Sequence, residues 1–276
     1  MKISAVIITK NEESNISHCL NSLSGVADEI IVVDALSDDA TKEICESFPK
    51  VRFYTKVWTG YATSKNFGND LAFGEYILSV DADEVLSETL RLELAEIKPN
   101  LTGNVAYALP RLNHIGTSEI KHCGWYPDKK LRLFPANKSL WTGDFVHEKL
   151  FFEGQIKPLK SDLLHFTYRS EAQYEEKIKN YALLSAQESF EKGKKMSLSF
   201  ALLKAGFKFI QIYFFKLGFL DGKKGKMIAE KMAKYVLWKY IALKQLNGKS
   251  NSTLVVGTRW MDKMFTKQNF DRVYNN

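Results

Sequence analysis

The feature that most constrains this chain is an apolar segment that ends in a group of acidic residues. Residues 76–80 (Tyr-Ile-Leu-Ser-Val) favour a buried β-strand, and Asp81, Asp83 and Glu84 follow directly. Because a carboxylate is not buried without a partner, the acidic group must lie where the strand leaves the core, at the carboxyl end of a sheet. In open α/β sheets, ligands bind at that edge.

The first two acidic residues of this group suggest a metal site. Asp81 and Asp83 are two positions apart, so in extended backbone they would share one face. Two carboxylates on one side suit Mg²⁺ or Mn²⁺, which keep water ligands and take others from phosphates. The alternative for an isolated Asp-x-Asp is an acidic turn that caps the following helix.

The pattern of apolar residues predicts an α/β fold. Residues 3–8 and 29–33 favour buried strands, and residues 16–23 between them have helical spacing, which defines a βαβ unit with parallel strands. Residues 105–109 and 130–134 are short strand candidates that would extend the sheet in mixed fashion. We therefore expect a mainly parallel, Rossmann-like mixed sheet flanked by helices.

Charge divides the chain unevenly. The net charge is +7, but residues 196–276 hold 15 Lys and Arg against 4 Asp and Glu, whereas residues 1–195 hold 24 against 28. This predicts a catalytic domain over 1–195 and a basic, aromatic helical extension over 196–276. Three cysteines without metal-like spacing fit a reducing compartment, and the apolar run at residues 3–8 is too short for a signal peptide, so we expect a cytoplasmic protein.

Polar residues follow the ends of the first two predicted strands. They are Asn11, Glu12, Asp34, Ser37 and Asp39. In a parallel sheet they would converge with the acidic group on one crevice, where they can hydrogen-bond a base and ribose. The alternative for each alone is a helix-capping or turn residue. Neither GxGxxG nor GxxxxGK[ST] occurs, which argues against a dinucleotide oxidoreductase and a P-loop ATPase.

Four ordered motifs resemble the family 2 glycosyltransferases: residues 7–12 (IITKNE), 32–41 (VVDALSDDAT), 65–66 (KN) and 78–84 (LSVDADE). The resemblance implies a GT-A fold, an inverting mechanism, a nucleotide-sugar donor and a divalent metal, Mg²⁺ or Mn²⁺. It places around the nucleotide or donor the residues Thr9, Asn11, Glu12, Asp34, Asp39 and Lys65, and it makes Asp83 a direct metal ligand.

Further segments resemble the bacterial branch that contains lipopolysaccharide-core β-glucosyltransferases: residues 124–134, 141–143, 146–148 and 216–222. This implies a UDP-sugar donor, UDP-glucose or a relative, and a lipid-linked glycan acceptor, with the lipopolysaccharide core first. Capsule, O-antigen or other glycolipid synthesis is the alternative. The chain departs from the family at Ala35-Leu36, where small residues are usual, and Leu36 would narrow the donor pocket.

An inverting transfer needs a carboxylate that takes the acceptor proton. Glu148 is the predicted base, with Asp128 and Asp144 as rivals and a structural salt bridge as the alternative for Glu148. His147 would orient Glu148, contact phosphate or be structural. Arg132, on a predicted strand, would contact the diphosphate or acceptor, or else face solvent. Three histidines, His114, His122 and His165, lack metal-ligand spacing and receive no role.

The basic extension predicts a membrane-interface element. As a helix, residues 197–220 would be about 36 Å long, with Lys204 and Lys208 on one side of a broad apolar surface. Residues 227–244 predict a second amphipathic helix. We expect the cytoplasmic face of the inner membrane as the location. Packing on the catalytic domain or a dimer contact is the alternative, and no open basic groove supports nucleic-acid binding.

Two other classes compete with a glycosyltransferase. A sugar nucleotidyltransferase would also need an α/β sheet and a metal, but the chain lacks a glycine-rich first loop bearing Arg or Lys. A catalytically inactive membrane-binding module would not need the Asp81 and Asp83 pair.

Overall fold

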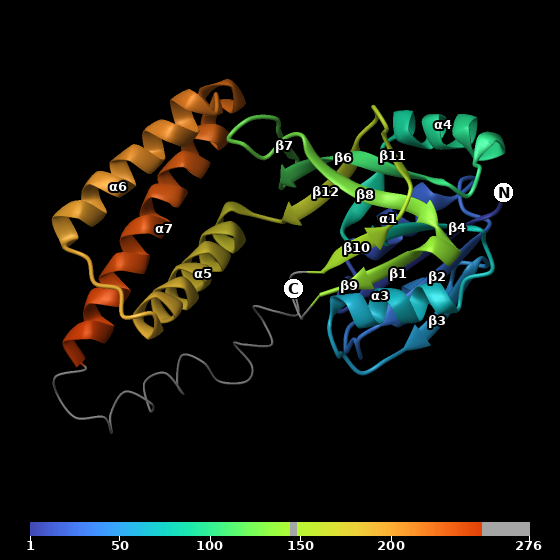
Figure 1. Cartoon of the computed structure of the whole chain (residues 1–276), viewed down its shortest axis with the longest axis horizontal. Helices are drawn as coiled ribbons and strands as arrows, with labels where there is room; N and C mark the ends of the chain where they lie inside the picture. Colours follow the sequence, from blue (N-terminus) through green and yellow to red (C-terminus); the bar gives the residue numbers. More distant parts are fainter. Residues whose placement is uncertain (144–147, 250–276) are drawn as a thin grey trace. The chain divides into compact units, whose positions relative to one another are not determined.

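The structure is a computed structural model that describes residues 1–143 and 148–249 (Figure 1). The chain forms two compact units, which are described separately. The first comprises residues 1–113 and 127–167, and the second comprises residues 114–126 and those from 168 onward. The predicted boundary at residue 195 between a catalytic part and a basic extension stays a prediction; the compact units divide the chain at other positions.

The first unit starts with the predicted alternation of strands and helices. Strands pair in parallel in the order β3-β2-β1-β4: β1 (Ile3–Thr9), β2 (Glu29–Asp34), β3 (Val51–Thr55) and β4 (Tyr76–Asp81). The connecting helices are α1 (Ile16–Leu23), α2 (Thr41–Glu46) and α3 (Tyr61–Asp70). The bounds of β1, β2 and α1 agree with the sequence prediction to within one residue.

The second half of the sheet is mostly antiparallel, as the mixed pattern predicted. Beyond β4 the order continues β8-β6-β12-β5: β8 (Asp128–Pro135), β6 (Val105–Ile115), β12 (Leu163–Tyr168) and β5 (Glu84–Leu86). Outside this path lie α4 (Glu88–Ile97), η1 (Lys98–Asn100), η2 (Ala136–Lys138), β11 (Gln155–Pro158) and the antiparallel pair β9 (Ser139–Thr142) and β10 (Lys149–Phe152). The complete sheet therefore has a parallel first half and a mostly antiparallel second half. This mixed, GT-A-like sheet confirms the predicted fold class.

Alternate residues of β1 pack into two cores on opposite faces of the sheet. Ile3, Ala5 and Ile7 join the core that contains α1, while Val6 and Ile8 join the core that contains residues of α3. Because both faces are covered, β1 is apolar without interruption except at Ser4. The polar residues at the strand ends therefore mark the open edge of the sheet.

The strand register brings the predicted site residues to that edge. Thr9 of β1 lies opposite Asp34 of β2, and Ile8 lies opposite Asp81 of β4. The convergence that the sequence predicted for the strand ends is therefore observed for Asp34 and Asp81, which lie on either side of the end of β1.

The second unit is helical. It contains the short strand β7 (Ser118–Ile120) and the helical segments α5 (Glu171–Glu191), α6 (Leu198–Ile210), η3 (Gln211–Phe215), η4 (Gly218–Asp221) and α7 (Gly222–Lys249). The expectation of one helix over residues 197–220 is wrong. The helix changes to π geometry at Gln211 and ends at Phe215, since Leu217 has a left-handed φ of 55°.

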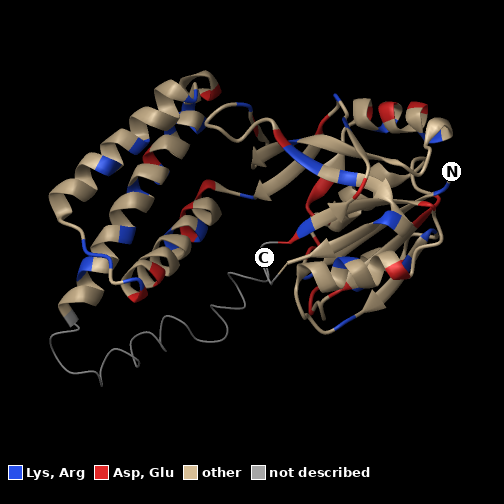
Figure 2. Ribbon diagram, in the orientation of Figure 1, with Lys and Arg blue, Asp and Glu red and all other residues tan. Residues whose placement is uncertain are grey.

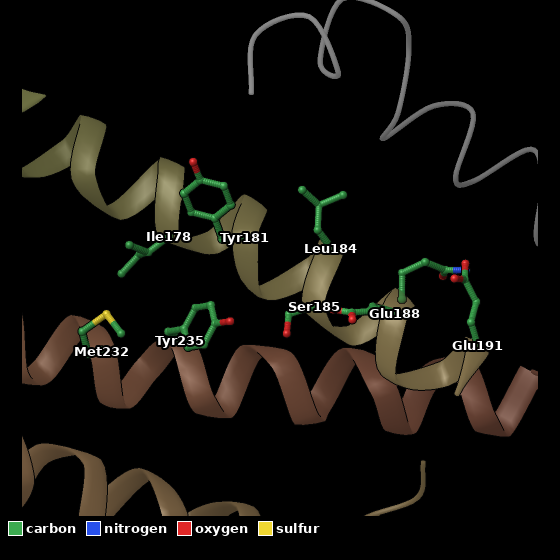
Figure 3. A pocket seen from close by; sticks show the side chains of 9 residues that line it. Ile178, Tyr181, Leu184, Ser185, Glu188, Glu191, Met232 and Tyr235 are labelled. Carbon is green, nitrogen blue, oxygen red and sulfur yellow. The ribbon is translucent and has the colours of Figure 1, made fainter. Parts of the chain in front are cut away.

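A cavity of about 620 Å³ opens between α5 and α7. Ile178, Tyr181, Met232 and Tyr235 form its apolar part, and Glu188 is among its polar lining residues (Figure 3). All of its lining residues belong to the second unit, whereas every predicted nucleotide, metal and catalytic residue belongs to the first. The cavity is therefore not part of the predicted site.

Helix α3 lies so close to the sheet that Gly68 cannot carry a side chain. A Cβ at Gly68 would overlap the Cγ1 atom of Val6 and would lie 3.2 Å from Cγ2 of Val33. We predict that Gly68→Ala lowers the free energy of unfolding by about 1–3 kcal/mol through overpacking, measured by urea denaturation. Gly206→Ala, in α6 where nothing lies within 4 Å, should be neutral or stabilising. Equal effects of the two changes would contradict the close packing.

Candidate active site

The loops after β1 and β2 hold each other in place. The backbone N–H of Asn11 donates to Oγ of Ser37 (2.8 Å), and the N–H of Asp38 donates to Oδ1 of Asn11 (3.0 Å). Ser37 in turn donates from its N–H and its hydroxyl to the Asp34 carboxylate. Asn11 and Leu36 both have a left-handed φ, 55° and 60°. The predicted nucleotide residues thus form one connected, locally strained surface.

Asp39 and Glu12 serve the start of α2. The Asp39 carboxylate accepts hydrogen bonds from the N–H and hydroxyl of Thr41, and Glu12 donates its N–H to the Thr41 hydroxyl (2.9 Å). Burial alone would raise the pKa of Asp39, but these hydrogen bonds and one from the Glu13 N–H hold it below its usual value. The N-cap of α2 is Ala40, so the turn alternative, and not the capping one, describes Asp39 as observed. Its contact with a nucleotide stays a prediction.

Asp81, at the end of β4, lies between two cations. Nη2 of Arg132 is 2.6 Å from Oδ2 of Asp81, and Nζ of Lys65 is 3.3 Å from Oδ1. Burial raises the pKa of Asp81, but the charges of Arg132 and Lys65 outweigh it and hold this pKa well below its usual range. Asp81 is therefore ionised at any physiological pH.

The same arginine neutralises Glu84. Nη2 of Arg132 is also 2.6 Å from Oε1 of Glu84, which is fully buried and 3.2 Å from Nη1 of Arg111. Arg132 itself is 4% exposed, so the solvent-facing alternative for it is wrong. Burial lowers the pKa of Arg132, but the charges of Asp81 and Glu84 raise it by more, so this pKa lies above its usual value. Arg132 therefore stays charged. The acidic group at the end of β4 is thus part of a cation–carboxylate network.

Lys65 connects this network to the predicted base. Its ammonium lies 3.3 Å from Oε1 of Glu148 as well as from Asp81, and it stands over the ring of Trp141 at 4.5 Å. Asn66 fixes that ring, because its side chain exchanges two hydrogen bonds with the Trp141 backbone. Glu148 thus lies at the predicted site. It also forms an ion pair with Lys65, as the alternative of a structural salt bridge predicted. Asp144 and His147 lie outside the described residues.

Asp128, the rival base, is engaged by other cations. Oδ2 of Asp128 accepts two hydrogen bonds from Arg111, at 2.6 and 3.0 Å, and Oδ1 lies 3.2 Å from Nζ of Lys130. Burial raises its pKa, but Arg111 and then Lys130 lower it below the usual value. A carboxylate whose ionised form is stabilised in this way is a weak proton acceptor.

His165, to which the sequence gave no role, lies beside the predicted metal ligand. Its Nε2 is 3.2 Å from Oδ2 of Asp83, and its Nδ1 is 2.7 Å from Oδ1 of Asn113 and 2.8 Å from the Thr167 hydroxyl. A buried polar residue in the apolar strand β12 was the signal in the sequence. The separation of 82 positions between Asp83 and His165 hid the contact, which the antiparallel pairing of β12 with β5 creates.

The donor chemistry around Asp83 fits a divalent ion. A carboxylate and an imidazole suit Mn²⁺, which can take its other ligands from water and phosphate. Both oxygens of Asp81 already contact cations, so Asp83 with His165 is the better-suited pair. Within residues 1–143 and 148–249 no cluster of three or more Asp, Glu, His or Cys side chains could hold an ion.

Three buried polar atoms around the site have no hydrogen-bond partner among the described residues: Oγ1 of Thr9, Nε of Arg132 and Nε1 of Trp141. Thr9 is at the end of β1 beside Asp34, where the nucleotide was predicted.

Comparison with known proteins identifies the family of the chain. Residues 4–160 match the model of glycosyl transferase family 2. An uncharacterized glycosyltransferase of Rickettsia felis is 31% identical over 81% of this chain and 83% of its own length. The lipopolysaccharide core biosynthesis glycosyltransferase LpsC of Rhizobium meliloti is 28% identical over 78% of this chain and 81% of its own length.

Among solved structures, S. aureus TarS 1–349 in complex with UDP-GlcNAc superposes with a TM-score of 0.44 at 17% identity, over 91% of this chain and 92% of its own length. The family match covers more than half of the chain, so the protein is a glycosyltransferase that uses a nucleotide sugar. It belongs to glycosyltransferase family 2, which confirms the resemblance seen in the four motifs.

The Asp128–Arg111 ion pair should make the stability of the fold depend on pH. Because the pKa of Asp128 is lower in the folded chain than its usual 3.8, the pair stabilises the fold fully above pH 3.8 and less as the pH falls towards the folded pKa. We expect Asp128→Asn to cost about 1–2 kcal/mol at pH 7. That difference from the wild type should shrink in urea denaturation below pH 3.8. A difference that does not change with pH would contradict the ion pair.

Proposed function

We propose that the protein is an inverting, metal-dependent hexosyltransferase that moves glucose or a related sugar from a UDP-sugar to a lipid-linked glycan. The observation that carries this proposal is Lys65, whose ammonium contacts both Asp81 and Glu148. One cation thus joins the predicted diphosphate end of the site to the predicted base. The named role of the relative LpsC supports the lipopolysaccharide core as the acceptor.

The nucleotide lies against the loops after β1 and β2 in this proposal. The Asp34–Ser37–Asn11 hydrogen bonds fix those loops before a ligand arrives, so little ordering entropy is lost on binding. Thr9, at the end of β1 beside Asp34, would lie next to the base or ribose in this proposal.

The departing diphosphate is stabilised by fixed charge. Lys65 and Arg132 are almost fully buried, and their cationic groups are held in place by carboxylates rather than by water. Charges fixed in advance stabilise a developing anion without reorganisation at the moment of reaction. A divalent ion held by Asp83 and His165 would neutralise further diphosphate charge.

Glu148 takes the proton of the acceptor hydroxyl as that oxygen attacks the anomeric carbon. It is partly exposed, so an acceptor can reach it, and its contact with Lys65 orients the carboxylate. Asp128 accepts two hydrogen bonds from Arg111, so in this proposal its role is structural.

The base assignment is tested by Glu148→Gln. We predict that transfer of radiolabelled sugar from UDP-glucose to bacterial lipopolysaccharide falls by about 10²–10⁴-fold. Calorimetric binding of the donor should stay within a few-fold of the wild type, because glutamine keeps the shape of the side chain.

The matched control is Asp128→Asn, which also converts a carboxylate to an amide. It should retain transfer to within about ten-fold. If Asp128→Asn is inactive while Glu148→Gln turns over, the base is Asp128. If Glu148→Gln mainly loses donor binding, Glu148 is a binding residue.

The donor and the metal are tested by calorimetry of UDP, GDP and UDP-sugars, with Mn²⁺ and then with EDTA. We expect UDP to bind more tightly than GDP and EDTA to weaken the binding. His165→Ala should lower the apparent affinity for Mn²⁺ by about 10–100-fold, by loss of a ligand or of its support. Nucleotide binding that neither EDTA nor His165→Ala alters would rule out the metal site, and absence of any nucleotide binding would remove the proposed function.

A further inference from the structure

We propose that the outward face of α6 and the turn after it dock this protein on the surface of an anionic membrane. This apolar surface, called the α6 face below, consists of the exposed side chains Leu198, Phe200, Leu202, Leu203, Phe207, Ile210, Phe214, Phe215, Leu217, Phe219 and Leu220. The inference concerns the second unit alone and does not depend on the chemistry proposed for the first.

Helix α6 buries small residues and exposes large apolar ones, which is the reverse of an ordinary surface helix. The residues it buries are small: Ala201 is 0% exposed and Ala205 is 4% exposed. Leu203 and Phe207, two positions further on and so on roughly the opposite side of the helix, are 71% and 59% exposed. A helix in water places its large apolar residues inward, so α6 is built for a non-aqueous environment on its outer side.

The exposed apolar surface is concentrated rather than scattered. More than half of the exposed large hydrophobic side chains in the described chain fall within residues 198–220. Isolated exposed leucines are normal, but a contiguous apolar surface of this kind marks an interaction site. Four outward residues at helical spacing form its centre: Leu203, Phe207, Ile210 and Phe214.

The charges beside the α6 face are almost all positive. Residues 194–249 contain 13 lysines but only two acidic residues, Asp221 and Glu230, and Figure 2 shows the lysines along α6 and α7. At about 100° per residue, Lys204 lies about 90° and Lys208 about 130° from the middle of the apolar strip, so both stand on one flank of it. Their ammonium groups contact the Tyr240 hydroxyl of α7 and Oε1 of Gln211. An apolar strip with flanking lysines complements a bilayer with anionic headgroups.

The lysines also favour lying on the membrane over crossing it. Leu198–Phe215 is the one segment of the described residues long and apolar enough to span a bilayer, with a mean hydropathy of 1.3. Lys204 and Lys208 would then stand near the bilayer centre, where a charge is costly. In the plane of the surface, both ammonium groups reach water and phosphate.

Charge argues against a second copy of the chain as the occupant. A dimer through the α6 face would bring Lys204 and Lys208 of both copies together, and residues 198–220 contain no Asp or Glu to compensate them. An anionic lipid surface gains from the same charges. Docking at the cytoplasmic face of the inner membrane would bring the enzyme to a lipid-linked acceptor.

The test is flotation of the full chain with phosphatidylcholine vesicles, with and without one quarter phosphatidylglycerol, at 50 and 500 mM NaCl. We expect binding to the anionic vesicles that falls at high salt. Leu203→Ser with Phe207→Ser should reduce it at least ten-fold, and Lys204→Gln with Lys208→Gln about five-fold for each lysine. The matched control, Leu92→Ser, removes an equally exposed leucine from α4 (63% exposed) and should change nothing.

A fluorescent label distinguishes surface docking from insertion. The three native cysteines are buried, so Phe207→Cys gives a single exposed thiol for an environment-sensitive dye, and Leu92→Cys is its control. The dye at position 207 alone should shift to the blue with anionic vesicles, and a headgroup-level quencher should act on it more strongly than one at the bilayer centre. Circular dichroism and melting temperatures confirm that the variants fold.

Several outcomes would overturn the proposal. They are no flotation with either vesicle, flotation that survives the serine substitutions, and stronger quenching from the bilayer centre with resistance to carbonate extraction, which indicates a spanning helix. Sedimentation that shows a dimer dissolved by the serine substitutions, without vesicle binding, would assign the α6 face to a second copy.

Discussion

The active site depends on one buried guanidinium. Arg132 contacts both Asp81 and the fully buried Glu84 at 2.6 Å, and removing one partner of such a pair typically costs 3–5 kcal/mol. It can reach them because β8 pairs antiparallel with β4, with Leu133 opposite Leu78, so that residues before Leu133 lie along the end of β4. The mixed sheet is therefore a condition of the site: a parallel strand at that place would present its other end.

The same arrangement explains how charges are kept ready for a diphosphate. A buried lysine or arginine is costly unless it is paired, and here the carboxylates at the end of β4 and at Glu148 supply the pairing. The cations therefore stay charged and in fixed positions. Asp81, which looks like a metal ligand in the sequence, holds two buried cations in the structure.

Local patterns in the sequence were enough for the first half of the fold. The βαβ unit, the acidic strand end and the two loops follow from periodicity and from parallel geometry, and Asp34 and Asp81 lie at the same edge of the sheet as predicted. Contacts that depend on antiparallel pairing of distant strands could not be predicted from the sequence, and the contact of His165 with Asp83 is one of them. In the sequence, Leu36 is a departure from small residues that would narrow the donor pocket. Its φ of 60° adds a reason for a small residue here, because glycine, which has no Cβ, adopts that conformation at less cost.

The basic extension also shows what could not be predicted from the sequence. Hydropathy identifies residues 198–215 as apolar, but it does not say which side of the helix faces protein. Packing decides that: Ala201, Ala205 and Ile212 are buried, and the larger side chains remain outside. Small residues let α6 approach α7 closely with little apolar area buried, so the helix gains little of its stability from that contact. A sequence that kept phenylalanine and leucine for the outer face is best explained by an apolar surface that these residues meet outside the folded chain.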